Sequence, residues 1–293
     1  EVVNFKLLYA KTVFLEQKEK FLQQKAFLRF FEENKFWLEP YAAFCVLRDK
    51  YGSSDYRQWK EYAEYNPEKI MSFISTDQAH FDEVAVNYFI QYHLHLQLSG
   101  AHEYAHERGV VLKGDIPIGV NRNSVDTWTN PELFHLNKQA GAPPDMFAVK
   151  GQNWELPTYN WEAMKRNGYD WWKKRFAQMS NYFDTFRIDH ILGFFRIWQI
   201  PENQEEGIMG HLYPSVPVHI NEFQEKGLWF DYNRYCKPYI NDNILWEIFG
   251  EEMIWVKANC LQIEDGWVLR LKPQFTSQKE VEKMFQEGTI SEK

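Results

Sequence analysis

Two short apolar runs, each preceded by a helix-like segment, constrain the fold of this chain more than any other feature. The first, residues 110–120, follows a long helical pattern that Gly109 ends. The second, residues 182–189, follows a helical pattern over 161–181. Helices that lead into buried strands are typical of parallel sheets. Both runs carry a polar residue near their carboxyl end, where the strands of a (β/α)₈ TIM barrel present functional side chains. We therefore predict an α/β fold, a partial TIM barrel.

The regions on either side of this central part predict two further subdomains. Residues 1–73 are helical in pattern with a predicted break at 37–40, and residues 121–159 predict a long functional loop. After Pro201 the periodicity is weak, except for a predicted strand at 267–271 and a helix from Ser277 onward. The predicted domains are a helical subdomain (1–75), the central barrel part (76–201) and an insertion subdomain (202–293).

Composition and charge exclude several classes of function. The net charge of −8 disfavours nucleic acid or an anionic membrane as partner, because both need a basic surface. There is no apolar run long enough to span a membrane and no signal-peptide pattern. The three cysteines, Cys45, Cys236 and Cys260, are far apart and form no CxxC motif. A reducing compartment, the cytoplasm, is therefore expected.

The aromatic content is high, at 17% with 12 tryptophans, and it is densest between residues 154 and 198. Core packing accounts for many such residues in any protein. Flat aromatic rings also bind the apolar faces of sugar rings, and this many rings cannot all face one core. The sequence therefore favours a cleft that binds carbohydrate.

Asp189 is the strongest candidate for a catalytic residue. It ends the second apolar run two residues after Arg187, and side chains at i and i+2 of a strand share a face. A neighbouring cation keeps a carboxylate ionised, as a covalent nucleophile requires. A structural ion pair between the two is the alternative. Asp115, in the first run, could join them at the same sheet edge.

Residues 102–106, HEYAH, match the H-E-x-x-H helix motif of zinc hydrolases. Such a site needs a third protein ligand, placed by a following helix or turn. Here Gly109 ends the helix three residues after His106, and an apolar run begins. We therefore expect a solvated helix face with no metal, and the zinc hydrolase remains a remote alternative.

A loop between the two runs presents Asp145 after a Pro-Pro pair and then Trp154 between polar residues, as suits a sugar-binding rim. Together with the runs, this loop resembles the 4-α-glucanotransferases of the amylomaltase family, glycoside hydrolase family 77, and most of all its disproportionating enzyme 2 branch. The matching segments are GVVLKGDIPIGVNRNSVDTW (109–128), GAPPDMF (141–147), GQNW (151–154) with PTYNWEAM (157–164), FRIDHILGFFRIWQIP (186–201), LWEIFG (245–250) and LRLKPQF (269–275).

The resemblance implies a retaining double displacement on α-1,4-glucans or maltooligosaccharides without any cofactor. Asp189 would be the nucleophile and Arg187 the cation that positions it. The residues implied in substrate binding are Asp115, Asp145, Trp154 and His190. The oligomeric state stays open. One departure is Glu155, which stands where that branch usually has a glycine.

The reaction also needs a second carboxylate as general acid and base. The glutamates of the insertion-like region do not end a buried apolar run in the sequence pattern; they are Glu202, Glu247, Glu251, Glu252 and Glu264. We therefore expect an internal segment of a longer enzyme, inactive by itself and ending before the acid/base strand. An α-amylase-type hydrolase and a non-catalytic glucan-binding protein remain alternatives.

Overall fold

The computed structural model describes residues 2–265 and 268–290. The chain forms two compact units, one made of residues 1–136 and 155–194 and the other of residues 137–154 and 195–293. No helix among the described residues is both long enough and apolar enough to cross a membrane.

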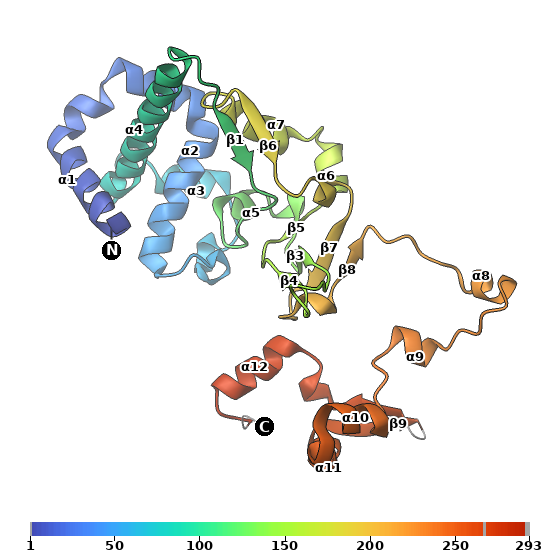
Figure 1. The fold of residues 1–293 in the computed structure, drawn as a ribbon. Helices are drawn as coiled ribbons and strands as arrows, with labels where there is room; N and C mark the ends of the chain where they lie inside the picture. Colours follow the sequence, from blue (N-terminus) through green and yellow to red (C-terminus); the bar gives the residue numbers. More distant parts are fainter. Residues whose placement is uncertain (1, 266–267, 291–293) are drawn as a thin grey trace. The chain divides into compact units, whose positions relative to one another are not determined.

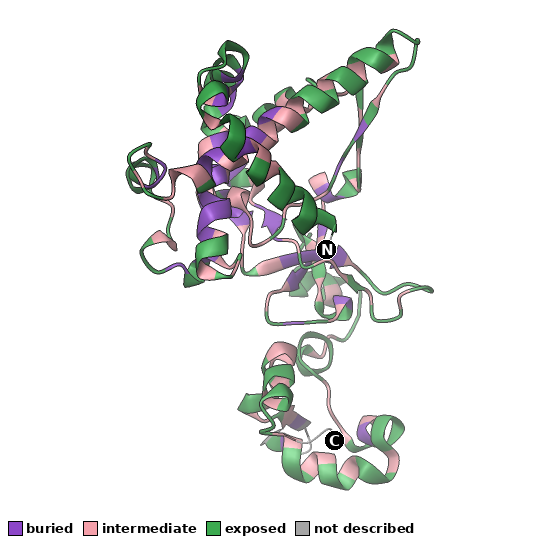
Figure 2. Cartoon of the chain, turned by 90° about the vertical axis from the view of Figure 1, so that its left-hand side faces the viewer, coloured by how far each residue is buried: buried purple, intermediate pink, exposed green. Residues whose placement is uncertain are grey.

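The first unit opens with a helical layer (Figure 1). Its helices are α1 (Val2–Leu22), α2 (Lys25–Tyr51), α3 (Pro67–Phe73) and α4 (Phe81–His106), with the 3₁₀ turns η1 (Tyr56–Gln58) and η2 (Lys60–Tyr62). The buried residues concentrate where α1, α2 and α4 pack together, as Figure 2 shows. Rings dominate this core: the Phe21 and Phe27 centroids lie 4.1 Å apart and both side chains are buried. The expected helical N-terminal region is confirmed.

The predicted helix break at 37–40 is wrong. Helix α2 continues through Pro40, and the chain instead breaks at Gln24, whose backbone is extended (φ −68°, ψ 120°). A proline inside a helix costs about 3 kcal/mol. The residues around it offset that cost, because Leu38 and Ala42 are completely buried and a buried leucine side chain alone contributes about 1.5–3 kcal/mol. Packing thus overrides the local signal.

The expected long helix before the first apolar run is confirmed as α4, which ends at His106. Gly109 has the left-handed conformation (φ 70°) that ends such helices readily. The chain then enters β1 (Lys113–Ile116), which pairs in parallel with β6 (Thr185–Ile188). The two expected strands and their parallel pairing are confirmed, although both strands are shorter than the apolar runs. Within residues 2–265 and 268–290 this pair forms its own two-stranded sheet, and no closed barrel is present.

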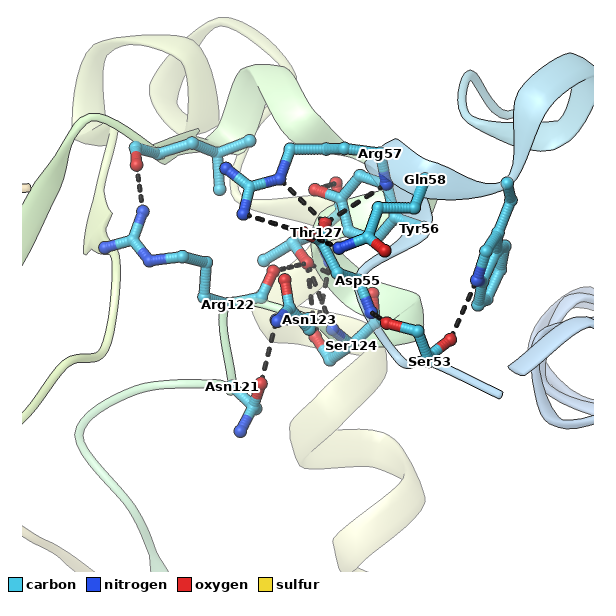
Figure 3. Close-up of polar contacts among 12 residues, drawn as sticks. Ser53, Asp55, Tyr56, Arg57, Gln58, Asn121, Arg122, Asn123, Ser124 and Thr127 are labelled. Carbon is cyan, nitrogen blue, oxygen red and sulfur yellow. Dashed lines mark hydrogen bonds and ion pairs between the residues drawn. The ribbon is translucent and has the colours of Figure 1, made fainter. Parts of the chain in front are cut away.

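The predicted long loop at 121–159 is wrong, because the segment has secondary structure of its own. It contains α5 (Val125–Thr129), η3 (Pro131–Leu133), β2 (Phe134–His135), β3 (Lys138–Ala142), β4 (Gln152–Asn153) and β5 (Thr158–Tyr159). Local hydrogen bonds explain α5: Ser124 and Thr127 form a capping box at its start. The Tyr56 hydroxyl donates to the Thr127 carbonyl (3.3 Å), which ties α5 to η1 (Figure 3). Gly, Pro and Asn in this segment thus mark tight turns between short elements.

The expected helix over 161–181 is divided into α6 (Trp161–Arg166) and α7 (Asp170–Met179). Gly168 and Tyr169 between them both have positive φ, 67° and 61°. The rings of this region mostly pack on one another: Trp161 and Trp172 stack with centroids 6.2 Å apart, and Trp172 is buried. After β6 the turn η4 (Ile191–Phe194) ends the first unit.

The second unit contains an antiparallel sheet in the order β4-β3-β7-β8. Strands β7 (Ile197–Pro201) and β8 (His211–Tyr213) were not predicted. A β-carbon on Gly141 would lie 2.1 Å from the Gln152 carbonyl oxygen, so the β3–β4 pairing requires glycine there. Glu202 follows β7 directly, contrary to the expectation that no glutamate of the region ends a buried run.

The rest of this unit is largely helical around a small core of Leu245, Leu261 and Leu269. Its elements are η5 (Gly207–Met209), α8 (Ile220–Glu225), α9 (Tyr232–Cys236), α10 (Asp242–Phe249), η6 (Gly250–Glu252), α11 (Met253–Cys260), β9 (Leu261–Asp265), β10 (Val268–Leu271), η7 (Pro273–Phe275) and α12 (Gln278–Gln286). The predicted strand at 267–271 is confirmed for β10, and Trp267 lies outside the described residues. The predicted final helix is α12, for which Ser277 supplies the N-cap.

Candidate active site

The carboxyl ends of β1 and β6 bring together two of the predicted site residues. Asp115 and Arg187 are register partners in the parallel pair. Arg187 donates from Nε to Asp115 Oδ1 (2.8 Å) and from Nη2 to Asp115 Oδ2 (2.5 Å). Such a two-point contact fixes the plane of the guanidinium as well as its position.

Each partner stabilises the charged form of the other. The hydrogen bonds from Arg187 hold the pKa of the Asp115 carboxyl below its usual value, and the attraction of the nearby positive charge adds to this. The same hydrogen bonds raise the pKa of the Arg187 guanidinium. Both side chains remain more than half exposed, at 61% for Arg187 and 55% for Asp115. Asp115 and Arg187 thus form a charged, solvent-exposed ion pair at the carboxyl end of the sheet.

Asp189 lies one residue beyond the end of β6. Its backbone N–H donates to the Ile116 carbonyl (3.1 Å), so the strand pairing continues to this residue. Its charge also helps to raise the pKa of Arg187, after the larger effect of Asp115. Arg187 therefore gives its hydrogen bonds to Asp115 while standing within electrostatic range of Asp189. The sequence predicted Asp115 at the same sheet edge but paired Arg187 with Asp189, whereas the hydrogen bonds of Arg187 go to Asp115.

His190 turns the chain away from the strand. Its φ of 49° is left-handed, which is uncommon for a residue other than glycine, and its carbonyl accepts from Gly193 N–H (2.9 Å). Backbone conformations of this kind cost on the order of 1 kcal/mol or more and concentrate at functional sites. The turn directs the chain into η4 immediately after Asp189.

Asp145 and Trp154 belong to the second unit. One oxygen of Asp145 accepts from the N–H groups of Phe147 (2.8 Å) and Ala148 (2.7 Å), so this carboxylate shapes its own turn. The Trp154 indole donates to the Gln152 side chain (3.0 Å), and its backbone N–H donates to Ala140 (3.0 Å). Both residues therefore have well-defined local positions.

Glu155 has a φ of 59°. Glycine adopts this left-handed region without strain, whereas a residue with a β-carbon is disfavoured there. The conformation gives a physical reason for the glycine that the resemblance leads one to expect at this position.

A further set of polar groups in the first unit was missed by sequence reasoning. A cavity of about 550 Å³, within the range of ligand pockets, is lined by residues that include Trp37, Trp171, Asp126 and Arg175. The Trp171 indole donates to Asp126 Oδ1 (3.0 Å), and the Arg175 guanidinium lies over the Trp171 ring at 5.1 Å. The only signal was that Asp126 stands inside the motif at 109–128.

Comparison with known proteins identifies the family. The model of the glycoside hydrolase 77 family, described as 4-alpha-glucanotransferase, matches residues 1–252. The chain belongs to this family. The match includes all the predicted site residues and both strands of the β1–β6 pair, so the 4-alpha-glucanotransferase family pattern covers the whole candidate site.

Individual members of the 4-alpha-glucanotransferase family agree. The 4-alpha-glucanotransferase DPE2 of rice, Oryza sativa subsp. japonica, is 47% identical over 256 residues, which are 87% of this chain and 27% of the rice protein. The 4-alpha-glucanotransferase of Chlamydia muridarum is 32% identical over 201 residues, 68% of this chain and 37% of that protein. The chain therefore spans about a quarter to two fifths of the length of these relatives.

Solved structures of amylomaltases are also similar. The amylomaltase of Streptococcus agalactiae, solved in complex with acarbose, matches 70% of this chain and 43% of its own with a TM-score of 0.62 and 29% identity. The amylomaltase of Corynebacterium glutamicum matches 79% of this chain and 28% of its own with a TM-score of 0.56 and 20% identity, a likeness of fold alone.

Proposed function

We propose that the protein containing this chain is a 4-α-glucanotransferase and that Asp189 is its nucleophile. The observation that carries the proposal is the carboxyl end of the β1–β6 pair, where Asp189 follows the strand beside a guanidinium fixed by Asp115. The family match over residues 1–252 supports it.

The proposed reaction is a retaining double displacement. An Asp189 carboxylate oxygen attacks the anomeric carbon of an α-1,4-linked glucose unit, and the bond from that carbon to the bridging oxygen breaks. A second carboxylate gives the leaving oxygen its proton, so a glucosyl ester of Asp189 and a shortened glucan result. The 4-hydroxyl of an acceptor sugar then attacks the ester, loses its proton to the same second carboxylate and releases Asp189. No cofactor takes part.

Arg187 and Asp115 would set the electrostatics of this step. The Arg187 guanidinium places a positive charge within electrostatic range of the Asp189 carboxylate. Asp189 loses its negative charge when the ester forms. The guanidinium of Arg187 stays in place during this step, because Asp115 accepts hydrogen bonds from both Nε and Nη2. The positive charge therefore stays where Asp189 must be regenerated.

The substrates we propose are α-1,4-glucans and maltooligosaccharides, with His190, Asp145 and Trp154 among the residues that bind them. The similar amylomaltase of S. agalactiae was solved with acarbose, which supports this choice. We further propose a partial TIM barrel as the architecture, with the boundaries 1–75, 76–201 and 202–293, and the cytoplasm as the location.

The test uses the intact protein with Asp189→Asn, which keeps the shape of the side chain but cannot form the ester. We expect glucose release from maltotriose to fall by about three orders of magnitude or more, with glucan binding retained. Asp77→Asn, an exposed aspartate on another segment of the first unit, is the matched control. Unchanged activity in Asp189→Asn would contradict the proposal and favour another nucleophile. A wild-type protein that binds glucan without any turnover would favour the binding protein, and net formation of reducing ends would favour the hydrolase.

A further inference from the structure

The last turns of α4 carry two histidines on one face. His102 and His106 are one helical turn apart, and their ring centroids lie 4.1 Å from each other. The sequence offered no third ligand on the segment that follows the helix. Two imidazoles at this spacing can bind the same ion once a third side chain faces them.

The third side chain comes from a distant part of the sequence. Asp184 directly precedes β6, and its Oδ1 lies 2.7 Å from His106 Nε2 and 3.2 Å from His102 Nε2. One nitrogen of each histidine and one oxygen of Asp184 all lie within 4.8 Å of one another. The fold thus assembles the three-ligand set that spacing along the helix could not reveal.

The carboxylate of Asp184 is held in place by the backbone that leads into β1. The second carboxylate oxygen, Oδ2, accepts from Leu112 N–H (2.9 Å). The backbone N–H of Asp184 donates to the Leu112 carbonyl (2.9 Å). These two bonds fix the carboxylate so that Oδ1 faces the imidazoles. A hydrogen bond to the outer side of a ligand is the usual support of a metal site.

We propose that His102, His106 and Asp184 bind a divalent transition metal ion of the zinc type, with water as the fourth ligand. Two imidazoles and a carboxylate suit this class of ion, which prefers four tetrahedral ligands at about 2.0–2.2 Å. The side chains are 19%, 47% and 24% exposed, respectively, so ion and water can enter from solvent.

The position of the site indicates a structural role. Asp184 and Leu112 lie at the starts of β6 and β1, whereas Asp115, Arg187 and Asp189 lie at the ends of the same parallel strands. An ion bound there would connect the end of α4 to the strand pair without reaching the proposed nucleophile. The inference therefore stands independently of the proposed function.

The competing explanation is a hydrogen-bonded cluster in which protons take the place of the ion. The test compares intact wild-type protein with two cluster variants, all first stripped of metal. One variant is Asp184→Asn, whose amide oxygen can still accept from Leu112 N–H, and the other is the double variant His102→Gln/His106→Gln. His211→Gln, an exposed histidine of β8, is the matched control. Co²⁺ is the spectroscopic probe, and Zn²⁺ is then added in competition with a chromophoric chelator.

Wild type and His211→Gln should each bind one Zn²⁺ per chain at this cluster. In either cluster variant this Zn²⁺ should be absent or bound at least about tenfold more weakly. Their Co²⁺ forms should show visible absorption bands typical of tetrahedral coordination. The melting temperature should rise with Zn²⁺ in wild type but not in the variants, and glucose release should not depend on the ion. Equal stoichiometry, affinity and Co²⁺ spectra in wild type and Asp184→Asn would overturn the proposal. The double variant provides the same comparison if Asp184→Asn fails to fold.

Discussion

The two ends of the β1–β6 pair use aspartates in opposite ways. At the carboxyl end, Asp115 binds a guanidinium through side-chain bonds, and Asp189 follows the strand. At the amino end, Asp184 is bound to the backbone of Leu112 and faces two histidines of α4. One end presents charge that an incoming molecule can meet, whereas the other uses its charge to attach a helix to the sheet.

This difference agrees with the general division of labour in parallel α/β folds. Residues at the carboxyl ends of the strands carry out chemistry, while those at the amino ends contribute mainly to stability. The comparison therefore predicts that substitutions at the carboxyl end change rates and leave the melting temperature nearly unchanged. Substitutions at the amino end should do the reverse.

After the proposed nucleophile itself, the largest effect is expected for Arg187→Leu in the intact protein. The substitution removes the cation that binds Asp115 and stands within electrostatic range of Asp189. We therefore expect kcat for glucose release to fall on the order of 10²–10³-fold. Arg187→Lys should recover only part of the rate, because an ammonium cannot reproduce the two-point contact. Arg166→Leu, an exposed arginine at the end of α6, is the control. A large loss of melting temperature with kcat unchanged would reverse the assignment of the two ends.

A smaller effect is expected for Asp115→Asn. The amide keeps the shape of the side chain but loses the charge that holds Arg187, so the guanidinium becomes free to pair with Asp189. We expect kcat to fall about tenfold to a hundredfold, less than for Arg187→Leu. Steady-state kinetics on maltotriose would measure it, and an effect confined to KM would instead assign Asp115 to substrate binding.

At the other end, Asp184→Ala should lower the melting temperature by several degrees and leave kcat nearly unchanged. The substitution removes the acceptor of the Leu112 N–H together with the partner of both histidines. Asp184→Asn should recover part of the stability, since its amide oxygen can still accept from Leu112. Calorimetric scans of the three proteins would measure the difference. Equal melting temperatures in all three would show that α4 is held without this contact.

The sequence predicted the carboxyl end better than the amino end, for a physical reason. Asp115, Arg187 and Asp189 stand near the ends of apolar runs, and the rule that parallel strands align their carboxyl ends brings such residues together. Asp184 pairs with histidines 78 and 82 residues away, and no local pattern links such positions. The ion pair between Arg187 and Asp115 could not be predicted from the sequence either, because it depends on the register of the two strands.

The fold shows the same limit in its helices and loops. Gly109 ended α4 as predicted, because a left-handed residue acts locally. Pro40 did not break α2, because burial of its neighbours depends on the tertiary core. The short strands of residues 134–159 pair with partners that periodicity cannot reveal over two residues. Local backbone chemistry was therefore predictable, and packing was not.

The smallest expected effect concerns pH and tests the amino end once more. The His95 ring on α4 hydrogen-bonds the hydroxyl of Tyr182 (3.0 Å), and Tyr182 stands two residues before Asp184. The same ring packs on Phe30, with ring centroids 4.9 Å apart. Burial lowers the pKa of the His95 imidazole below its ordinary value of 6.5, and the charge of Glu33 opposes this only in part. The folded state thus binds fewer protons than the unfolded state just below pH 6.5.

The contribution of His95 to the free energy of unfolding should therefore be fully present above about pH 6.5. It should decrease as the pH falls below this value, because the unfolded state binds the proton first. Burial lowers the pKa of His93 in the same way, so the wild-type slope contains both contributions. His95→Gln keeps a partner for Tyr182 but cannot be protonated, and should make the loss of stability between pH 6.5 and 5 shallower by part of the wild-type slope. Urea unfolding of wild type, His95→Gln and the control His211→Gln across this range measures the difference. A slope in His95→Gln equal to that of wild type would mean that the contact between α4 and the start of β6 does not depend on a neutral His95.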